Sequence, residues 1–211
     1  MSEITLRSVA EYMYRLLPAR DPVLAEMEER AAKERIPIVG PSVGALFYQL
    51  ARLTRARRIF EMGSAIGYST IWWARGTEKG GEVYYTDGDP ENAEAADDYL
   101  KRAGVRDRVV ILVGNSLDLI DRVDGEFDIV FNDVDKHYYP EVYEKAAGRV
   151  RIGGLFVTDN VLWSGRVADA SVRDRDTTNI RKFNKLLFSD QRYESSIIPL
   201  RDGVAIGLRA R

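Results

Sequence analysis

A short apolar run that ends in two glycines constrains this chain more than any other stretch. Residues 59–62 read Ile-Phe-Glu-Met, which is typical of a buried strand, and the run breaks at Gly63 and Gly67 before helical spacing resumes from Tyr68. Glycines at a strand-to-helix corner let the backbone turn tightly and approach a ligand, and the free N–H groups of the new helix face that ligand. Because many structural turns also carry two glycines, this corner alone leaves a plain turn and a cofactor site equally open.

Composition excludes several kinds of site. The chain has 211 residues, a formal net charge of -2, no cysteine and one histidine. Disulfides, thiolate metal sites and multi-histidine metal centres are therefore excluded, and bulk positive charge for nucleic acid is lacking. No apolar run approaches membrane-spanning length and the N-terminus lacks a signal-peptide layout, so we expect a cytoplasmic protein with no membrane partner.

Helices and strands should alternate after an all-helical start. Residues 1–57 carry three apolar stripes at helical spacing, which we expect to pack on the main domain or on a second subunit. Strands are predicted at 59–62, 82–86, 109–113, 127–131, 155–158, 193–199 and 204–208. Between the fourth and fifth strands we expect a helix over 139–150 and a turn at Gly153-Gly154.

This alternation predicts the fold class. Repeated βα units require right-handed crossovers and a parallel sheet that is covered by helices on both faces. The tight turn signal at residues 201–203 makes the last two strands antiparallel. We therefore expect one α/β domain over 1–211, with an N-terminal helical extension (1–57) and a core over 58–211.

Polar residues at the predicted strand ends indicate the kind of cofactor. Asp87 closes the second strand, where an acidic residue bonds ribose hydroxyls, although a solvated strand end or a helix cap is an equal alternative. The corner is not the dinucleotide pattern G-x-G-x-x-G, and Glu61 would repel a pyrophosphate. A carboxylate there attracts a cationic ligand, which favours S-adenosylmethionine (SAM), whose sulfonium and ammonium groups are positive.

A second set of polar residues follows the fourth and fifth strands. Asp133 ends one strand, and Asp159 and Asn160 end the next. If these strands are neighbours, three oxygen-bearing side chains meet, which suits a hard divalent ion such as Mg²⁺ better than it suits mere strand-end caps. Lys136 follows closely, and a lysine beside a cation should lose its proton more readily, as a general base requires. The alternative for Lys136 is an ordinary surface lysine.

These residues resemble a known family. The chain is similar to class I SAM-dependent O-methyltransferases of the cation-dependent group, which includes catechol and caffeoyl-CoA O-methyltransferases and many bacterial members. The matching motifs are Phe60-Glu61-Met62-Gly63 with Gly67-Tyr68-Ser69, the run 128–136 (Asp-Ile-Val-Phe-Asn-Asp-Val-Asp-Lys), the run 158–165 (Thr-Asp-Asn-Val-Leu-Trp-Ser-Gly) and Asp202-Gly203. The resemblance implies a Rossmann-like, seven-stranded, mostly parallel sheet with an antiparallel last strand, and commonly a homodimer.

The resemblance also implies roles for individual residues. Asp133, Asp159 and Asn160 would bind Mg²⁺ or another divalent cation such as Mn²⁺ or Ca²⁺, and Lys136 would help to deprotonate the substrate hydroxyl. Residues in contact with SAM would be Val39, Glu61, Gly63, Ser69, Asp87, Ser116 and Asp133. Val161, Leu162 and Trp163 would wall the pocket, whereas Tyr138, Tyr139 and Tyr143 would pack in the following helix.

The expected activity is methyl transfer from SAM to a hydroxyl oxygen of a small catechol-like or aromatic substrate. A second branch of the family acts on hydroxyuridine in tRNA, for which the arginines of 52–58 and 166–181 would be the contact surface. Two other classes remain as alternatives. A nicotinamide-dependent oxidoreductase is opposed by the missing G-x-G-x-x-G, and a non-catalytic SAM-binding module is opposed by the intact set Asp133, Lys136, Asp159 and Asn160.

Overall fold

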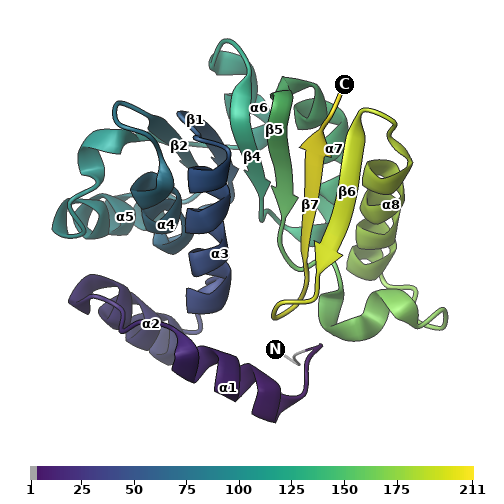
Figure 1. Cartoon of the computed structure of the whole chain (residues 1–211), viewed down its shortest axis with the longest axis horizontal. Coiled ribbons are helices and arrows are strands. Elements are labelled where there is room, and N and C mark those ends of the chain that lie inside the picture. The colour runs from purple at the N-terminus through teal and green to yellow at the C-terminus, as the bar shows by residue number, and fades with distance from the viewer. Residues whose placement is uncertain (1–3) are drawn as a thin grey trace.

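Strands and helices alternate from residue 58 onward in the structure, a computed structural model that describes residues 4–211 (Figure 1). The strands are β1 (Arg58–Met62), β2 (Glu82–Asp87), β3 (Val109–Val113), β4 (Phe127–Asn132), β5 (Val150–Thr158), β6 (Tyr193–Ile198) and β7 (Val204–Arg209). The helices are α1 (Arg7–Leu16), α2 (Pro22–Glu34), α3 (Gly40–Leu53), α4 (Tyr68–Gly76), α5 (Pro90–Arg102), α6 (Ser116–Leu119), α7 (Tyr139–Ala146) and α8 (Arg175–Ser189). Short 3-10 segments lie at Arg106–Arg108, Ile120–Arg122, Lys136–Tyr138, Ala147–Arg149 and Trp163–Ala168.

The sheet has seven strands in the order β3-β2-β1-β4-β5-β7-β6. Strands β1 to β5 pair in parallel, and β7 runs antiparallel to both of its neighbours, so the expected Rossmann-like fold with a reversed last strand is confirmed. The last strand enters the sheet between β5 and β6. Strand order reverses between β1 and β4, and in such sheets a crevice for ligands opens beyond the carboxyl ends of the strands at that point.

Helices cover both faces of this sheet and bury an aromatic core on each. On one face, α2 to α5 pack against the strands, and the ring of Phe47 on α3 stacks on Trp73 of α4 with centroids 4.2 Å apart. On the other face lie α6, α7 and α8, where the rings of Tyr143 and Phe183 meet edge to face at 5.8 Å. These two cores hold the strand ends in fixed positions.

Strand β5 is longer than the sequence predicts. The helix expected to reach Val150 ends at Ala146, and β5 begins at Val150 instead of Leu155. Gly153-Gly154 therefore lies inside the strand and makes no turn, so that prediction was wrong. Gly153 adopts a φ of +77° beside a shift of register between β4 and β5, and a Cβ on Gly154 would lie 2.6 Å from the carbonyl oxygen of Asp128. The glycines are needed for a bulge and for close approach of two strands.

The N-terminal helices behave in two ways. The stripe of α2 packs into the core as expected, for example through Met27, and so does that of α3 through Val43, but Leu53 at the end of α3 is 80% exposed. Helix α1 buries none of its residues, and Leu6 and Leu16 remain 75% and 65% exposed. In Figure 1, α1 and α2 lie below the sheet, on the side where the parallel strands end. Between residues 4 and 211 no helix has the length and apolar character needed to cross a membrane.

Candidate active site

A cavity of about 650 Å³ opens at the carboxyl ends of the parallel strands. It is of the size that small-molecule and cofactor sites have. Seven of the predicted site residues line it together: Gly63, Asp87, Ser116, Asp133, Lys136, Asp159 and Asn160. The other three, Val39, Glu61 and Ser69, are buried and do not line the cavity.

The corner after β1 brings the ends of two strands into contact. Gly63 has a φ of +83°, and a Cβ at this position would lie 2.7 Å from the carbonyl oxygen of Asp133. The backbone N–H of Asp133 donates to the carbonyl of Met62 at 2.9 Å. A side chain at Gly63 is therefore excluded both by its backbone conformation and by lack of space. The result is that the backbone of the first strand end and that of Asp133 form one edge of the cavity.

Glu61 is a fully buried acid behind this corner. It accepts a hydrogen bond from the hydroxyl of Thr70, and its Oε1 has no partner among the described residues. Burial raises the pKa of the Glu61 carboxyl to about 7, the hydroxyls of Ser69 and Thr70 oppose this shift, and the charge of Asp133 adds to it. Because the pKa of Glu61 lies near neutral pH, a positive charge placed beside this carboxyl would stabilise its ionised form.

Asp87 presents a fixed carboxylate to the cavity. Its Oδ2 accepts from the N–H of Ala65 at 2.9 Å, and its Oδ1 accepts from the N–H of Asp89 at 2.9 Å and from Nδ2 of Asn92 at 3.0 Å. Asp89, not Asp87, caps α5, so Asp87 is not the helix cap that the sequence left open. Asn92 also lines the cavity and was missed. Its place in the first turn of the helix that follows Asp87 was the available signal.

Ser116 lies on the same side of the cavity, at the start of α6. Its Oγ lies 2.8 Å from Oγ1 of Thr86, one residue before Asp87 on β2. The Ser116 side chain is therefore oriented by the strand that carries Asp87, and both residues stand along the same wall.

The polar residues after β4 and β5 converge because those strands are neighbours. Asn132 and Thr158 are register partners, so the residues that follow them, Asp133 and Asp159, leave the sheet side by side. Nζ of Lys136 lies 2.8 Å from Oδ1 of Asp133. The N–H of Asn160 donates to Oδ1 of Asp159 at 2.8 Å, and Asn160 adopts a φ of +59°, a conformation that asparagine tolerates better than most residues.

The buried acid Asp159 and the half-buried acid Asp133 share one ammonium group here. Burial raises the pKa of Asp159 to about 7, and the negative charge of Asp133 adds to that shift. Burial likewise raises the pKa of Asp133, although Lys136 opposes it. Burial is the largest single influence on the Lys136 ammonium and lowers its pKa, but the charge of Asp133, together with smaller contributions from Tyr139 and Asp159 and from the hydrogen bond to Asp133, outweighs burial, so the pKa lies above its ordinary value. Lys136 holds its proton firmly while these acids are charged, which differs from the weakened proton expected beside a cation.

The donor set suits a hard divalent cation. Two carboxylates and one amide oxygen are ligands that Mg²⁺ prefers, and the repulsion between Asp133 and Asp159 would be relieved by a positive ion between them. Within residues 4–211 no three His, Cys, Asp or Glu side chains gather as a metal cluster, because the third member of this set is an asparagine. The residues therefore fit a weakly held ion that keeps other oxygen ligands.

Aromatic residues near Lys136 differ in part from expectation. Tyr139 and Tyr143 are buried, as expected, but Tyr138 is half-exposed and lines the cavity, so its assignment to packing was wrong. None of Val161, Leu162 and Trp163 lines the cavity, so that prediction was wrong: Val161 lies in the core, and the other two pack against it. The Trp163 ring centroid lies 6.0 Å from Nζ of Lys136, and Trp163 has a φ of +47°.

Comparison with known proteins gives a consistent result. The model of a family described as O-methyltransferase matches residues 18–210. A catechol O-methyltransferase of Niastella koreensis is 32% identical over 99% of both chains. Among solved structures, the O-methyltransferase TomG of Streptomyces achromogenes in complex with SAM has a TM-score of 0.88 at 32% identity, covering 97% of this chain and 96% of that one. An O-methyltransferase of Bacillus cereus in complex with SAH has a TM-score of 0.87 at 30% identity, covering 96% and 97%.

The buried acid Glu61 predicts how stability changes with pH. Its pKa is about 7 in the folded chain and lower when unfolded, so its stabilising contribution is complete below the unfolded pKa and is lost as pH rises through 7. In the presence of chelator, Glu61→Gln should raise the free energy of unfolding at pH 8 by the order of 2 kcal/mol and change it little at pH 5. Urea unfolding at both pH values measures this difference.

The exposed Glu94 offers a matched control. Glu94→Gln should shift stability equally little at both pH values. A Glu61→Gln difference that is the same at pH 5 and pH 8 would contradict the buried, nearly neutral state of Glu61.

Proposed function

This chain belongs to the O-methyltransferase family, a family of SAM-dependent enzymes, and from that premise we propose that it methylates a hydroxyl oxygen of a small aromatic substrate with the help of a divalent cation. The observation that supports this most is the meeting of Asp133, Lys136, Asp159 and Asn160 with Asp87 in one cavity. Family membership decides against a nicotinamide-dependent oxidoreductase and against a non-catalytic binding module.

The wall that carries Asp87 and Ser116 is our proposed place for the nucleoside of SAM. Asp87 would accept hydrogen bonds from the ribose hydroxyls, because its two oxygens are already aimed by Ala65 and Asn92. Ser116 would lie beside the adenine. Both residues line one cavity with Gly63, so the nucleoside and the methionine part can be bound together.

Negative charge around the strand ends supports the placement of the methionine part. Glu61 is a buried acid and Asp133 a half-buried one, and the pKa values of both are raised, so a cationic ligand would stabilise their ionised forms. The sulfonium and ammonium groups of SAM carry such charge. Gly63 would let the ligand approach the backbone, while Ser69 would act through its hydroxyl on Glu61, and Val39 would contribute backbone from the start of α3.

Asp133, Asp159 and Asn160 would hold the divalent cation on the other side of the cavity. A bound Mg²⁺ would lower the pKa of a substrate hydroxyl and take up the charge of the two acids. Asp133 would then no longer stabilise the Lys136 ammonium, so Nζ could release its proton and accept the one from the substrate hydroxyl. The oxyanion attacks the methyl carbon, the C–S bond breaks as the O–C bond forms, and SAM leaves as S-adenosylhomocysteine.

A small substrate is favoured over tRNA by the state of the arginines. Arg52 and Arg55 pair with Glu78, and Arg166 pairs with Asp174. Arg181 donates to backbone carbonyls, including that of Val172 at 2.6 Å. Guanidinium groups that are already paired in this way are less available to phosphates. We therefore propose a catechol-like acceptor, and methylation of tRNA is an alternative outcome of the test below.

The test of this function is a transfer assay with labelled SAM on a panel of catechols and on hypomodified tRNA. Label should enter catechols, an excess of chelator should abolish transfer, and added Mg²⁺ or Mn²⁺ should restore it. Transfer to tRNA alone would overturn the substrate class. Full transfer to a catechol after exhaustive chelation would overturn the role of the cation.

Replacing Asp87 should lower the affinity of the protein for SAM. Asp87→Ala should weaken SAM binding roughly 10- to 100-fold, because a hydrogen bond to a charged group contributes about 1.5–3 kcal/mol. Calorimetric titration measures the affinity. Asp107→Ala, at an exposed position outside the cavity, is the control and should leave SAM affinity unchanged. Equal affinities in the two variants would rule out ribose binding by Asp87.

Replacing Lys136 should lower the rate of methyl transfer. Lys136→Ala should lower the turnover rate by roughly 10²–10⁴, the range for a positioned proton acceptor, while SAM affinity changes little. Lys136→Arg should fail almost as badly, since a guanidinium keeps the charge but accepts no proton near neutral pH. Raising the pH should partly rescue both variants by ionising the substrate. Lys185→Ala, an exposed lysine of α8, is the control. A near-normal rate in Lys136→Arg would show that the residue only stabilises the oxyanion.

We also propose that the chain forms a homodimer through α1. Leu6, Val9 and Leu16 expose apolar surface on a helix that buries none of its residues, and burying such surface favours association. Light scattering should give a mass of twice 23.9 kDa. Replacing Leu6 and Leu16 with Gln should produce monomers, whereas a monomeric wild-type chain would disprove this assembly.

A further inference from the structure

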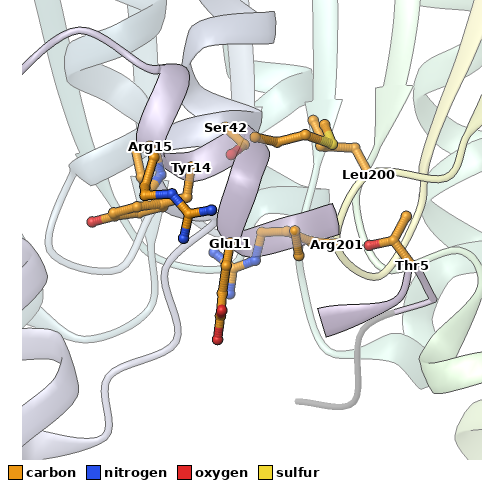
Figure 2. Close-up of a pocket in the computed structure, with 10 residues that line it drawn as sticks. Thr5, Glu11, Tyr14, Arg15, Ser42, Leu200 and Arg201 are labelled. Atoms are coloured by element: carbon orange, nitrogen blue, oxygen red, sulfur yellow. The ribbon is translucent and has the colours of Figure 1, made fainter. Parts of the chain in front are cut away.

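A second cavity, of about 390 Å³, lies between α1, the first turn of α3 and the turn that joins β6 to β7. Figure 2 shows Tyr14 and Arg15 of α1 on one side and Leu200 and Arg201 of the β6–β7 turn on the other. Met13 and Pro41 add apolar lining. The cavity therefore combines apolar walls with two guanidinium groups.

Arg201 joins this second cavity to the site at the strand ends. Its Nη1 donates to the carbonyl of Ile38 at 3.2 Å and also to the carbonyl of Val39. Ile38 lines the larger cavity, whereas Arg201 lines the smaller one.

The position of Arg201 is specified by its surroundings. Its φ is +51°, a left-handed conformation that costs free energy in a residue other than glycine. Its Nη1 occupies the place of a side chain at Gly40, since a Cβ there would lie only 2.0 Å away. A strained turn and a glycine opposite it thus place one guanidinium between the two cavities.

That guanidinium still has donors to offer. Only Nη1 is engaged among the described residues, and no carboxylate within residues 4–211 forms an ion pair with Arg201 or with Arg15. The one acid that lines this cavity, Glu11, pairs with Arg7 at 2.8 Å. A half-buried arginine whose remaining N–H groups form a planar fork matches a carboxylate well.

We propose that this second cavity holds the far end of the methyl-accepting substrate, and that this end carries a carboxylate bound by Arg201 with the help of Arg15. The inference rests on the proposed function, because the hydroxyl end of the same molecule would lie at Lys136 and the metal ligands. The ring of the acceptor would contact Met13, Pro41 and Leu200. The substrate class is accordingly an aromatic acid with a catechol group.

The test compares 3,4-dihydroxybenzoate with its neutral analogue 3,4-dihydroxybenzamide. The ratio of kcat/KM for the acid to kcat/KM for the amide should exceed one in the wild type. It should fall roughly 10- to 100-fold in Arg201→Gln, the factor expected for one lost charge-assisted hydrogen bond. Comparing two substrates within each variant cancels any effect of Arg201→Gln on SAM binding or on the Ile38 carbonyl.

Two further variants complete the design. Arg15→Glu reverses a charge on an exposed helix residue and should lower the same ratio even if Arg201→Gln folds poorly. Arg173→Gln, an exposed arginine in the loop before α8, should leave the ratio unchanged. A ratio equal to that of the wild type in Arg15→Glu, or in folded Arg201→Gln, would overturn the proposal.

Failure of the proposed methyl transfer can be distinguished from failure of carboxylate binding in the second cavity. If neither compound accepts a methyl group, calorimetric binding of 3,4-dihydroxybenzoate to the full chain loaded with S-adenosylhomocysteine still tests the cavity. Binding that weakens in both Arg201→Gln and Arg15→Glu would support the acid-binding pocket. Binding that is absent in the wild type, or unchanged in both variants, would overturn it.

Discussion

Two carboxylates, one buried and one half-buried, share one ammonium group at the open edge of the sheet. Asp133 and Asp159 leave neighbouring strands side by side, and Lys136 can pair closely with only one of them. One of the two carboxylates is therefore left without a close cationic partner. Removing such a charge from water costs free energy, which the rest of the fold must supply. Here two aromatic cores fix the sheet on both faces, and the acids occupy its open edge. The negative charge of this arrangement favours cations over anions at the edge.

The same edge explains why the surrounding loops have their particular shapes. Gly63 lets the end of β1 approach the backbone of Asp133, and Asn160 accepts a left-handed conformation directly after Asp159. Arg201 ties the last turn of the sheet to the residues that precede α3. The left-handed conformations of Asn160 and Arg201 cost conformational free energy, and all three positions face the cavities in which we place the cofactor, the cation and the substrate.

Local patterns predicted much of this structure, and long-range packing accounts for what they missed. Apolar runs located all seven strands, and the polar residues at strand ends, the glycine corner and the family resemblance together located seven lining residues of the main cavity. Gly153-Gly154 was misread as a turn, because a bulge between two paired strands and a turn use the same residues. Arg201 could not be found from motifs, since its role depends on partners that only folding brings close, whereas Asn92, in the first helical turn after Asp87, had a local signal that was missed. The sequence could not predict that α1 is exposed, because its apolar residues have the spacing of a buried helix.

The central claim is that Asp133, Asp159 and Asn160 form a binding site for a divalent cation. Calorimetric titration of Mn²⁺ into chelator-treated protein, saturated with S-adenosylhomocysteine, tests it without any assumption about the substrate. We predict one ion per chain, a large loss of affinity in the isosteric Asp159→Asn, and no loss in Asp124→Asn, at an exposed position outside the cavity. Equal Mn²⁺ affinity in wild type and Asp159→Asn, or no binding at all in a protein that methylates catechols, would contradict it.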